Sequence, residues 1–165
     1  MKKNKAVQLG QEMIYEEMRD RLLKRALSYL GASYEYGAKR WDGKDIKDFP
    51  ETFDCSSFVH ALYLILGIEI PKRSIEQASF GKLVTEENLK IGDLIFFKSD
   101  TGFYNPEYPD GVGHVMMYIG NNQVIGACGN FPYKRKRIGQ VAMFSLKLVL
   151  NRNDFRGVKR IIGHV

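Results

Sequence analysis

The spacing of apolar residues changes once along this chain of 165 residues, and that change constrains the fold more than any other feature. Up to about Gly67 the apolar residues recur every three or four positions, which is the period of a helix with one buried face. From Ile91 onward they form short apolar or alternating runs bounded by turn residues, as strands do. Helices followed by a series of strands predict the α+β class with a mostly antiparallel sheet.

Three helices are expected in the first part of the chain. The first spans about Gln8 to Leu30, the second runs from Cys55 to about Leu66, and a short third lies near Ser74–Ser79. Gly31 and Gly67 follow the first two patterns, and glycine commonly ends a helix. The apolar residues that step by four in the first helix are Ile14, Met18, Leu22 and Ala26.

Five strands are expected in the second part. They are Leu94–Phe97, Val115–Ile119, Gln123–Ala127, Val141–Leu150 and Val158–Ile162. The segment Gly120-Asn121-Asn122-Gln123 separates two of these runs and predicts a hairpin turn, because asparagine and glycine tolerate the backbone angles that such turns need.

Length and composition favour one domain covering residues 1–165. Hydrophobic residues make up 44% of the chain and charged residues 27%, which is ordinary globular composition. Within this domain we expect an N-terminal helix at 1–30, a second helical region at 31–90 and a sheet region at 91–165.

Several classes of protein are disfavoured. No apolar run of 18 residues is present, so no membrane span is expected. The basic start, Met1 to Lys5, is followed by charged and amide residues, so no apolar core of a secretory signal is visible. The net charge of +6 is mild, and neither zinc-finger spacing nor an aromatic-basic RNA motif occurs, so nucleic acid is not an expected partner.

Cys55 is the first candidate for chemistry. Two cysteines are too few for a disulfide framework, so at least one free thiol is expected. Cys55 follows Asp54, a favoured N-cap residue, and so would lie in the first turn of the second helix. The free N–H groups and partial positive charge there lower the pKa of a thiol and can receive an oxyanion. This placement indicates a nucleophile, and a buried structural cysteine is the alternative.

His114 is the expected base for that thiol. It begins the predicted strand that contains Val115–Ile119, after the glycine-rich approach Gly111-Val112-Gly113. His60 lies five residues after Cys55 on the same helix, roughly 140° around it, and therefore points away.

Five segments in chain order resemble the motifs of one family. They are Gly31-Ala32-Ser33-Tyr34-Glu35-Tyr36-Gly37, Phe53-Asp54-Cys55-Ser56-Ser57-Phe58-Val59, Ile70-Pro71-Lys72-Arg73-Ser74 with Gln77, Ile91-Gly92-Asp93-Leu94-Ile95-Phe96-Phe97, and Gly113-His114-Val115-Met116-Met117-Tyr118-Ile119-Gly120. On these segments the chain resembles the NlpC-type cysteine peptidases of bacterial cell walls, the NlpC and p-sixty family. The resemblance covers about Leu23 to Ala127.

The resemblance implies a papain-like α+β fold with the helix of Cys55 packed on a mostly antiparallel sheet. It implies Cys55 as the nucleophile, His114 as the base and Tyr34 as a group that helps to hold the oxyanion. The positions that match contacts to the stem peptide of peptidoglycan are Asp54, Ser56 and Arg73. The implied reaction is hydrolysis of the bond after D-glutamate through an acyl-thioester. No metal or organic cofactor is implied.

The chain departs from the family pattern at the third catalytic position, twelve residues after the base. Gly126 stands there, and glycine has no side chain to orient an imidazole. Asn130 is the first candidate replacement, Gln123 is the second, and a backbone carbonyl is a further option. Cys128 would share a strand face with Gly126. It could quench Cys55 through a disulfide or act as a small buried filler.

Two further departures bear on the site. Ser57 stands where the family usually has glycine, and the loop from Ala38 to Thr52 is longer than usual. This loop could form a wall of the substrate groove or be a surface insertion. The pattern Val-Ile-Gly-Ala-x-Gly around Gly126 resembles phage-associated members.

The expected function is therefore a peptidoglycan endopeptidase. Because no secretion signal is visible, we expect it to be made in the cytoplasm and delivered to the wall by a phage or a secretion apparatus. Two alternatives stay open. One is a wall-binding homologue with weak or no activity, which Gly126 favours, and the other is a cysteine amidase or acyltransferase that acts on another amide.

Overall fold

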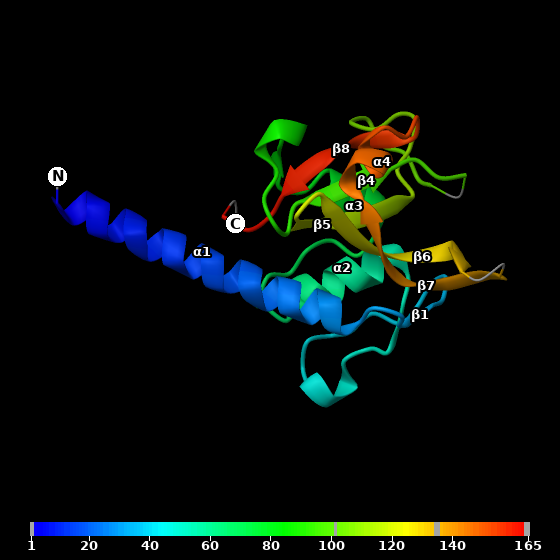
Figure 1. Cartoon of the computed structure of the whole chain (residues 1–165), viewed down its shortest axis with the longest axis horizontal. Helices are drawn as coiled ribbons and strands as arrows, with labels where there is room; N and C mark the ends of the chain where they lie inside the picture. The colour runs from blue at the N-terminus through cyan, green and yellow to red at the C-terminus, as the bar shows by residue number, and fades with distance from the viewer. Residues whose placement is uncertain (1, 101, 134–135, 164–165) are drawn as a thin grey trace.

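The computed structural model describes residues 2–100, 102–133 and 136–163, with side chains at 7–100, 102–129 and 139–163. Figure 1 shows helices gathered beside one curled sheet, which confirms the α+β class. In chain order the elements are α1 (Lys2–Ser28), β1 (Ser33–Tyr34), η1 (Ile46–Asp48), β2 (Thr52–Phe53), α2 (Cys55–Leu64), α3 (Ser74–Ala78), β3 (Lys82–Leu83), η2 (Glu86–Asn88), β4 (Leu94–Phe97), β5 (His114–Gly120), β6 (Gln123–Tyr133), β7 (Lys136–Ser145), α4 (Leu146–Leu150) and β8 (Phe155–Arg160).

The described strands form one sheet in the order β2-β1-β7-β6-β5-β4-β8-β3. Each pair of neighbours is antiparallel except β1 and β2, so the predicted mostly antiparallel sheet is confirmed. The two-residue strands β1, β2 and β3 were not expected, because two residues are too few to show an alternating pattern.

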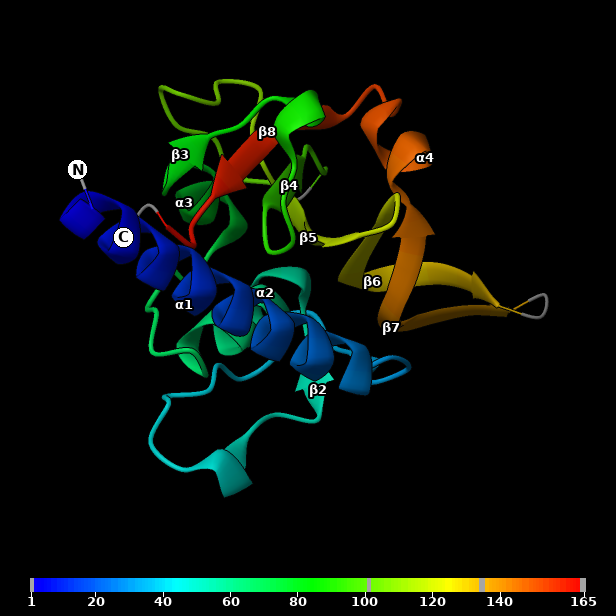
Figure 2. The same ribbon diagram turned by 60° about the vertical axis from the view of Figure 1, so that its left-hand side comes forward.

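The two faces of the sheet are covered by different elements (Figure 2). On one face α2 packs Phe58, Val59 and Leu62, all fully buried, against the central strands. The other face holds a smaller cluster that α4 covers: Ile95, Phe97, Met116, Val124, Val149 and Val158. Because α2 is buried along most of its length, the residue at its start is held firmly against the sheet.

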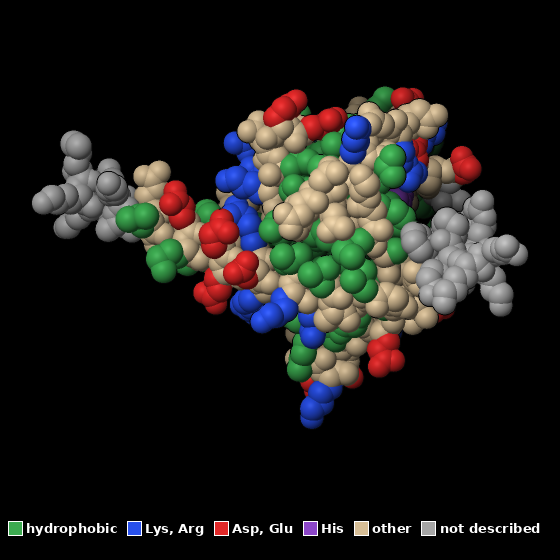
Figure 3. Space-filling model, in the orientation of Figure 1, with side chains coloured by type: hydrophobic (Ala, Val, Ile, Leu, Met, Phe, Trp, Pro, Cys, Tyr) green, Lys and Arg blue, Asp and Glu red, His purple; other side chains and the backbone are tan. Residues whose placement is uncertain are grey.

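The first helix extends further than expected and packs along only part of its length. It begins at Lys2 rather than Gln8, and its N-terminal half projects from the body. Leu22 and Ala26 are fully buried, whereas Ile14 is 57% exposed. Acidic side chains gather on the projecting half (Figure 3). Within the described residues, no helix combines the length and the apolar character needed to cross a membrane.

The expected strand Val141–Leu150 is wrong in its second half, because residues 146–150 form α4. Within that helix Val149 is buried, and Leu146 and Leu150 pack beside it. Spacings of three and four residues bring these side chains to one face of a helix, whereas a strand would divide them between two faces. A short apolar run fits both structures, and here the packing decides.

The expected hairpin between β5 and β6 is confirmed. Asn121 and Asn122 have positive φ angles of 49° and 58°, which a tight turn of this type requires at both central residues. Both side chains are exposed, so the turn is selected by backbone angles rather than by burial.

This turn yields a stability prediction. Asn122→Ala is expected to lower the free energy of unfolding by about 1 kcal/mol, because a residue with a Cβ is disfavoured in the left-handed region. Asn122→Gly is the matched control and should leave stability nearly unchanged. Chemical denaturation measures both variants. Equal losses in the two would show that the asparagine side chain, and not the backbone angle, is what matters.

Candidate active site

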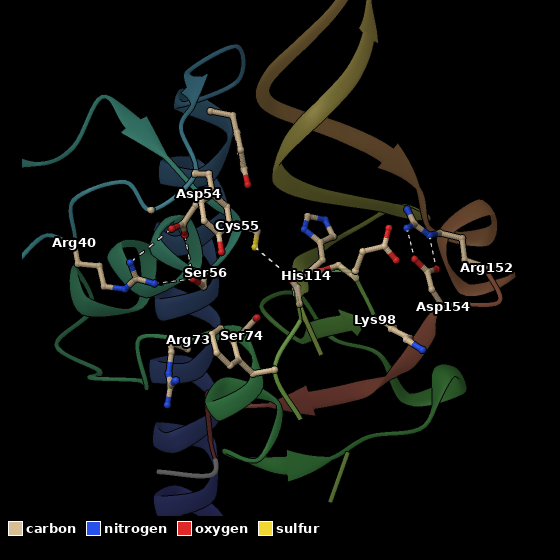
Figure 4. A pocket seen from close by; sticks show the side chains of 17 residues that line it. Arg40, Asp54, Cys55, Ser56, Arg73, Ser74, Lys98, His114, Arg152 and Asp154 are labelled. Atoms are coloured by element: carbon tan, nitrogen blue, oxygen red, sulfur yellow. Dashed lines mark hydrogen bonds and ion pairs between the residues drawn. The ribbon is translucent and has the colours of Figure 1, made fainter. Parts of the chain in front are cut away.

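A cleft of about 590 Å³ opens at the start of α2, between that helix and the first residue of β5 (Figure 4). Its lining includes six of the sequence-predicted site residues: Tyr34, Asp54, Cys55, Ser56, Arg73 and His114. Charged residues that the motifs did not indicate also line it: Arg40, Lys98, Asp100, Arg152 and Asp154.

The start of α2 is fixed by a reciprocal pair of hydrogen bonds. The backbone N–H of Ser57 donates to Asp54 Oδ1 at 2.7 Å, and the backbone N–H of Asp54 donates to Ser57 Oγ at 2.9 Å. This capping box satisfies two N–H groups that a helix start leaves free. It also accounts for serine at position 57, because glycine could not supply the second half of the pair.

The thiol of Cys55 lies in the first turn of α2 and faces the other wall of the cleft. Cys55 is 8% exposed, and its Sγ donates to the carbonyl oxygen of Gly113 at 3.8 Å. Burial, and next the Asp54 carboxylate, raise the pKa of Cys55 to about 11, while backbone N–H groups lower it to a smaller extent. The expectation of a lowered thiol pKa is therefore wrong: burial outweighs the helix N-terminus.

His114 begins β5 and faces the cleft from the opposite side. Its ring centroid lies 5.9 Å from that of Phe97, and its Nε2 lies 3.6 Å from Cys128 Sγ. Burial, and next the positive charge of Arg152, lower the pKa of His114 to about 4. The histidine is therefore neutral near pH 7, with a lone pair free to accept a proton.

Tyr34 lies at the end of β1 and packs against Gly129 of β6 and Gly139 of β7. Its ring has room because the strands beside it carry glycines: a Cβ at Gly129 or Gly139 would come within 2.8 Å of Tyr34. Burial, and next the nearby Cys55, raise the pKa of Tyr34 to about 12. The phenol thus keeps its proton and can donate a hydrogen bond to a developing negative charge.

Arg40 ties the long loop to the helix start. Its Nη2 donates to Ser56 Oγ at 2.9 Å and to the carbonyl of Lys72 at 2.7 Å. Its Nη1 lies 3.6 Å from Asp54 Oδ2. The loop from Ala38 to Thr52 therefore supplies part of one wall of the cleft through this residue.

This contact yields a second stability prediction. Arg40→Met is expected to lower the free energy of unfolding by about 1–3 kcal/mol, because it removes the hydrogen bond to the buried Ser56 hydroxyl and the positive charge beside the buried Asp54 carboxylate. Lys39→Met is the matched control, since Lys39 is exposed on the same loop. Denaturant titrations compare the variants. A loss in Arg40→Met no larger than in the control would show that the arginine does not anchor the loop.

The remaining walls carry ion pairs. Arg73, the N-cap residue of α3, binds Glu76 at 2.6 Å and lies over the ring of Phe103. Across the cleft Arg152 binds Asp154 at 2.6 Å, and the two residues lie beyond His114 (Figure 4). Over the described part of the chain, no three His, Cys, Asp or Glu side chains gather as metal ligands do.

The third catalytic position has no side chain in this chain. A Cβ at Gly126 would lie 2.9 Å from Cγ of Met116 on β5, so that space is already occupied. The side chain of Asn130 lies outside the described residues. Gln123 pairs with Gly120 at the opposite end of β5 from His114, so it is too distant to orient the imidazole. Cys128, which the sequence did not suggest for this position, is in contact with the ring.

The residues that sequence reasoning missed share one property: no local motif marks them. Arg40 lies in the long loop, and Arg152 and Asp154 lie between α4 and β8. Each reaches the cleft through tertiary packing. The one available signal was the length of the loop before the nucleophile motif.

Comparisons with known proteins show which family this chain resembles. The model of the NlpC/P60 family matches residues 31–137. The chain is 37% identical over 106 residues to a gamma-D-glutamyl-L-lysine dipeptidyl-peptidase of Bacillus cereus, covering 64% of this chain and 27% of the relative. It is 30% identical over 135 residues to the murein DD-endopeptidase MepS/murein LD-carboxypeptidase of Escherichia coli, covering 75% and 62%.

A solved structure shares the fold. The P60 domain of an antigen from Mycobacterium avium subspecies paratuberculosis superposes with a TM-score of 0.67 at 25% identity, covering 92% of this chain and 99% of that one. The chain spans between 17% and 62% of the length of the curated relatives it matches. The papain-like α+β fold and the family match together establish that this chain belongs to the NlpC/P60 family.

Proposed function

We propose that this protein is a cysteine endopeptidase that hydrolyses the stem peptide of peptidoglycan between D-glutamate and the diamino acid that follows it. The observation that carries the proposal is the cleft itself, which places the thiol of Cys55 at a helix start across from His114. The names of the relatives support the substrate class, since two of them act on glutamyl-lysine or murein bonds.

The reaction begins from two neutral groups. Because Cys55 has a raised pKa and His114 a lowered one, the thiol keeps its proton until the substrate is bound. As the sulfur attacks the peptide carbonyl carbon, His114 takes the thiol proton. The carbonyl π electrons move to oxygen, and the backbone N–H of Cys55 and the phenol of Tyr34 stabilise that oxyanion.

The remaining steps release the two products and restore the thiol of Cys55. The tetrahedral intermediate collapses, the C–N bond breaks, and the imidazolium of His114 protonates the leaving amine, so that an acyl-thioester forms on Cys55. His114 then takes a proton from a water molecule that attacks the thioester carbon. The thiolate leaves, recovers its proton from His114, and the carboxylic acid product departs.

The walls of the cleft suit a zwitterionic peptide. Arg40 and Asp54 lie at one end, Arg73 with Glu76 lies beside them, and Arg152 with Asp154 lies at the other end. Stem peptides carry both carboxylates and amines, so charges of both signs around the nucleophile fit this class of ligand. Asp54, Ser56 and Arg73 remain the residues proposed to contact the substrate.

The starting protonation states predict a broad pH profile. We expect kcat/KM to be level between the pKa of about 4 at His114 and that of about 11 at Cys55. It should fall at lower pH because the imidazolium cannot accept the thiol proton, and at higher pH because no proton reaches the leaving group. Initial rates on a soluble stem peptide measure this. An acid limb near the ordinary histidine pKa of about 6.5 would contradict it.

Mass spectrometry of muropeptides tests the proposal. Purified walls with lysine or with diaminopimelate at the third position are digested under reducing conditions, with Cys55→Ala as the blank. New fragments that end in D-glutamate, absent from the blank, support the proposal. Fragments cut at another bond would overturn the specificity, and equal products from the blank would overturn the role of Cys55.

A non-catalytic homologue that binds the wall is the second candidate, and Gly126 is the observation that favours it. The same digests decide between the two. If the protein leaves every wall type uncut yet sediments with intact walls, the binding role replaces the enzymatic one. If it neither cuts nor binds walls, an amide in another class of substrate becomes the better hypothesis.

A further inference from the structure

The thiol of Cys128 lies against His114, and the proposed reaction does not use it. Cys128 Sγ and His114 Nε2 are 3.6 Å apart, within hydrogen-bonding range for sulfur. The contact follows from the sheet register. Met117 on β5 pairs with Ile125 on the antiparallel strand β6. Continuing this register, three residues back along β5 and three residues forward along β6, brings His114 opposite Cys128. Side chains directly opposite in an antiparallel pair are close neighbours.

The usual place for a partner of the histidine is closed in this chain. Met116 lies over Gly126, and a Cβ there would approach its Cγ to 2.9 Å. A side chain at position 126 would have to displace that methionine. An orienting contact for His114 from β6 therefore has to come from another residue of the strand, and Cys128 is in place to make it.

The thiol proton of Cys128 decides which of the two groups donates the hydrogen bond. Burial, and next the nearby Cys55, raise the pKa of Cys128 to about 12, so its thiol keeps its proton near pH 7. The S–H can be directed to the carbonyl oxygen of Gly126, 3.9 Å from the sulfur. The sulfur lone pairs then face His114 Nε2, and a hydrogen bond between them requires the ring proton on Nε2.

We propose that Cys128 is the positioning residue for His114: its sulfur accepts a hydrogen bond from Nε2–H and so leaves Nδ1 unprotonated as the base. The tautomer of a histidine is set by the hydrogen bond that its other nitrogen makes. The ring of Phe97, 5.9 Å from that of His114, limits rotation on another side. The proposal rests on the proposed function, because it assigns a partner to the base of that reaction.

The kinetic test compares three replacements of Cys128 under reducing conditions. Cys128→Ser keeps a hydrogen-bond acceptor, Cys128→Ala removes it, and Cys128→Val removes it while filling the space. We expect kcat to fall about five- to tenfold in the alanine and valine variants, the size of one weak hydrogen bond. KM should be unchanged, and the serine variant should stay within about threefold of the native kcat. Equal losses in the serine and valine variants would indicate a packing role and overturn the proposal.

The spectroscopic test does not depend on activity. Nitrogen-15 NMR of the imidazole separates a protonated ring nitrogen from a bare one, and the signals of His114 are those lost in His114→Gln. We expect a single tautomer with the proton on Nε2 in the native protein and in Cys128→Ser, and a mixture of tautomers in Cys128→Val. A bare Nε2 in the native protein would overturn the proposal.

The two tests separate this inference from the proposed function. If the native protein cuts no wall but shows the Nε2–H tautomer and loses it in Cys128→Val, the proposed reaction fails while the positioning contact stands. If it cuts walls and the tautomer is the same in every variant, the reaction stands and the role of Cys128 is wrong.

Discussion

Replacing Cys55 with alanine is expected to lower kcat by about 10⁴- to 10⁶-fold, and replacing His114 with glutamine should cost nearly as much. The double replacement should be no worse than the Cys55 variant alone. The reason is that the two residues act as one unit: without a thiol there is no proton for the imidazole to take, and without the base a thiol with a pKa of about 11 is a poor nucleophile near pH 7.

Single-turnover rates on a soluble stem peptide measure the three variants. Circular dichroism checks that each one is folded. The control variant is Ser74→Ala, which alters another residue of the same cleft and leaves the proposed reacting groups intact. Losses that multiply in the double variant would contradict the coupling, because they would mean that each residue contributes to the rate on its own.

Replacing Arg160 with leucine is expected to lower the free energy of unfolding by about 3–5 kcal/mol. Arg160, the last residue of β8, donates from Nε to Asp93 Oδ1 at 2.8 Å and from Nη2 to Asp93 Oδ2 at 2.6 Å. The Asp93 side chain is 2% exposed. Without Arg160 the Asp93 carboxylate would stay buried. Among the described contacts, the hydrogen bond from the backbone N–H of Lys90 would remain to it.

Denaturant unfolding measures this loss, and two further variants interpret it. The double variant Asp93→Leu with Arg160→Leu should recover much of the stability, because it removes the stranded charge. Lys44→Leu breaks an exposed pair with Asp42 and should cause no measurable change. If Arg160→Leu resembles Lys44→Leu, the buried pair between β8 and the start of β4 does not stabilise the fold.

Local patterns in the sequence were sufficient for most helices and strands and for selecting the two residues that we propose to react. The runs around α2 and β4 and the hairpin at Asn121 and Asn122 were correctly placed, because side-chain period and turn chemistry act over a few residues. Cys55 and His114 could be selected for the same reason: one stands at a helix start marked by its N-cap, and the other at the start of a strand marked by its apolar pattern.

Tertiary structure alone decided three features. The run at residues 146–150 became a helix because α4 packs Val149 against the sheet, a contact that its own periodicity does not specify. The pKa of Cys55 rose because the fold buries the thiol, and burial is a property of the whole core. Arg40 and Cys128 reached the site because loop docking and strand register bring residues that are distant in the chain into contact. Local preferences therefore determined the elements and the positions of Cys55 and His114 on them, whereas burial and register, which depend on the packing of the entire chain, determined the environment of these two side chains.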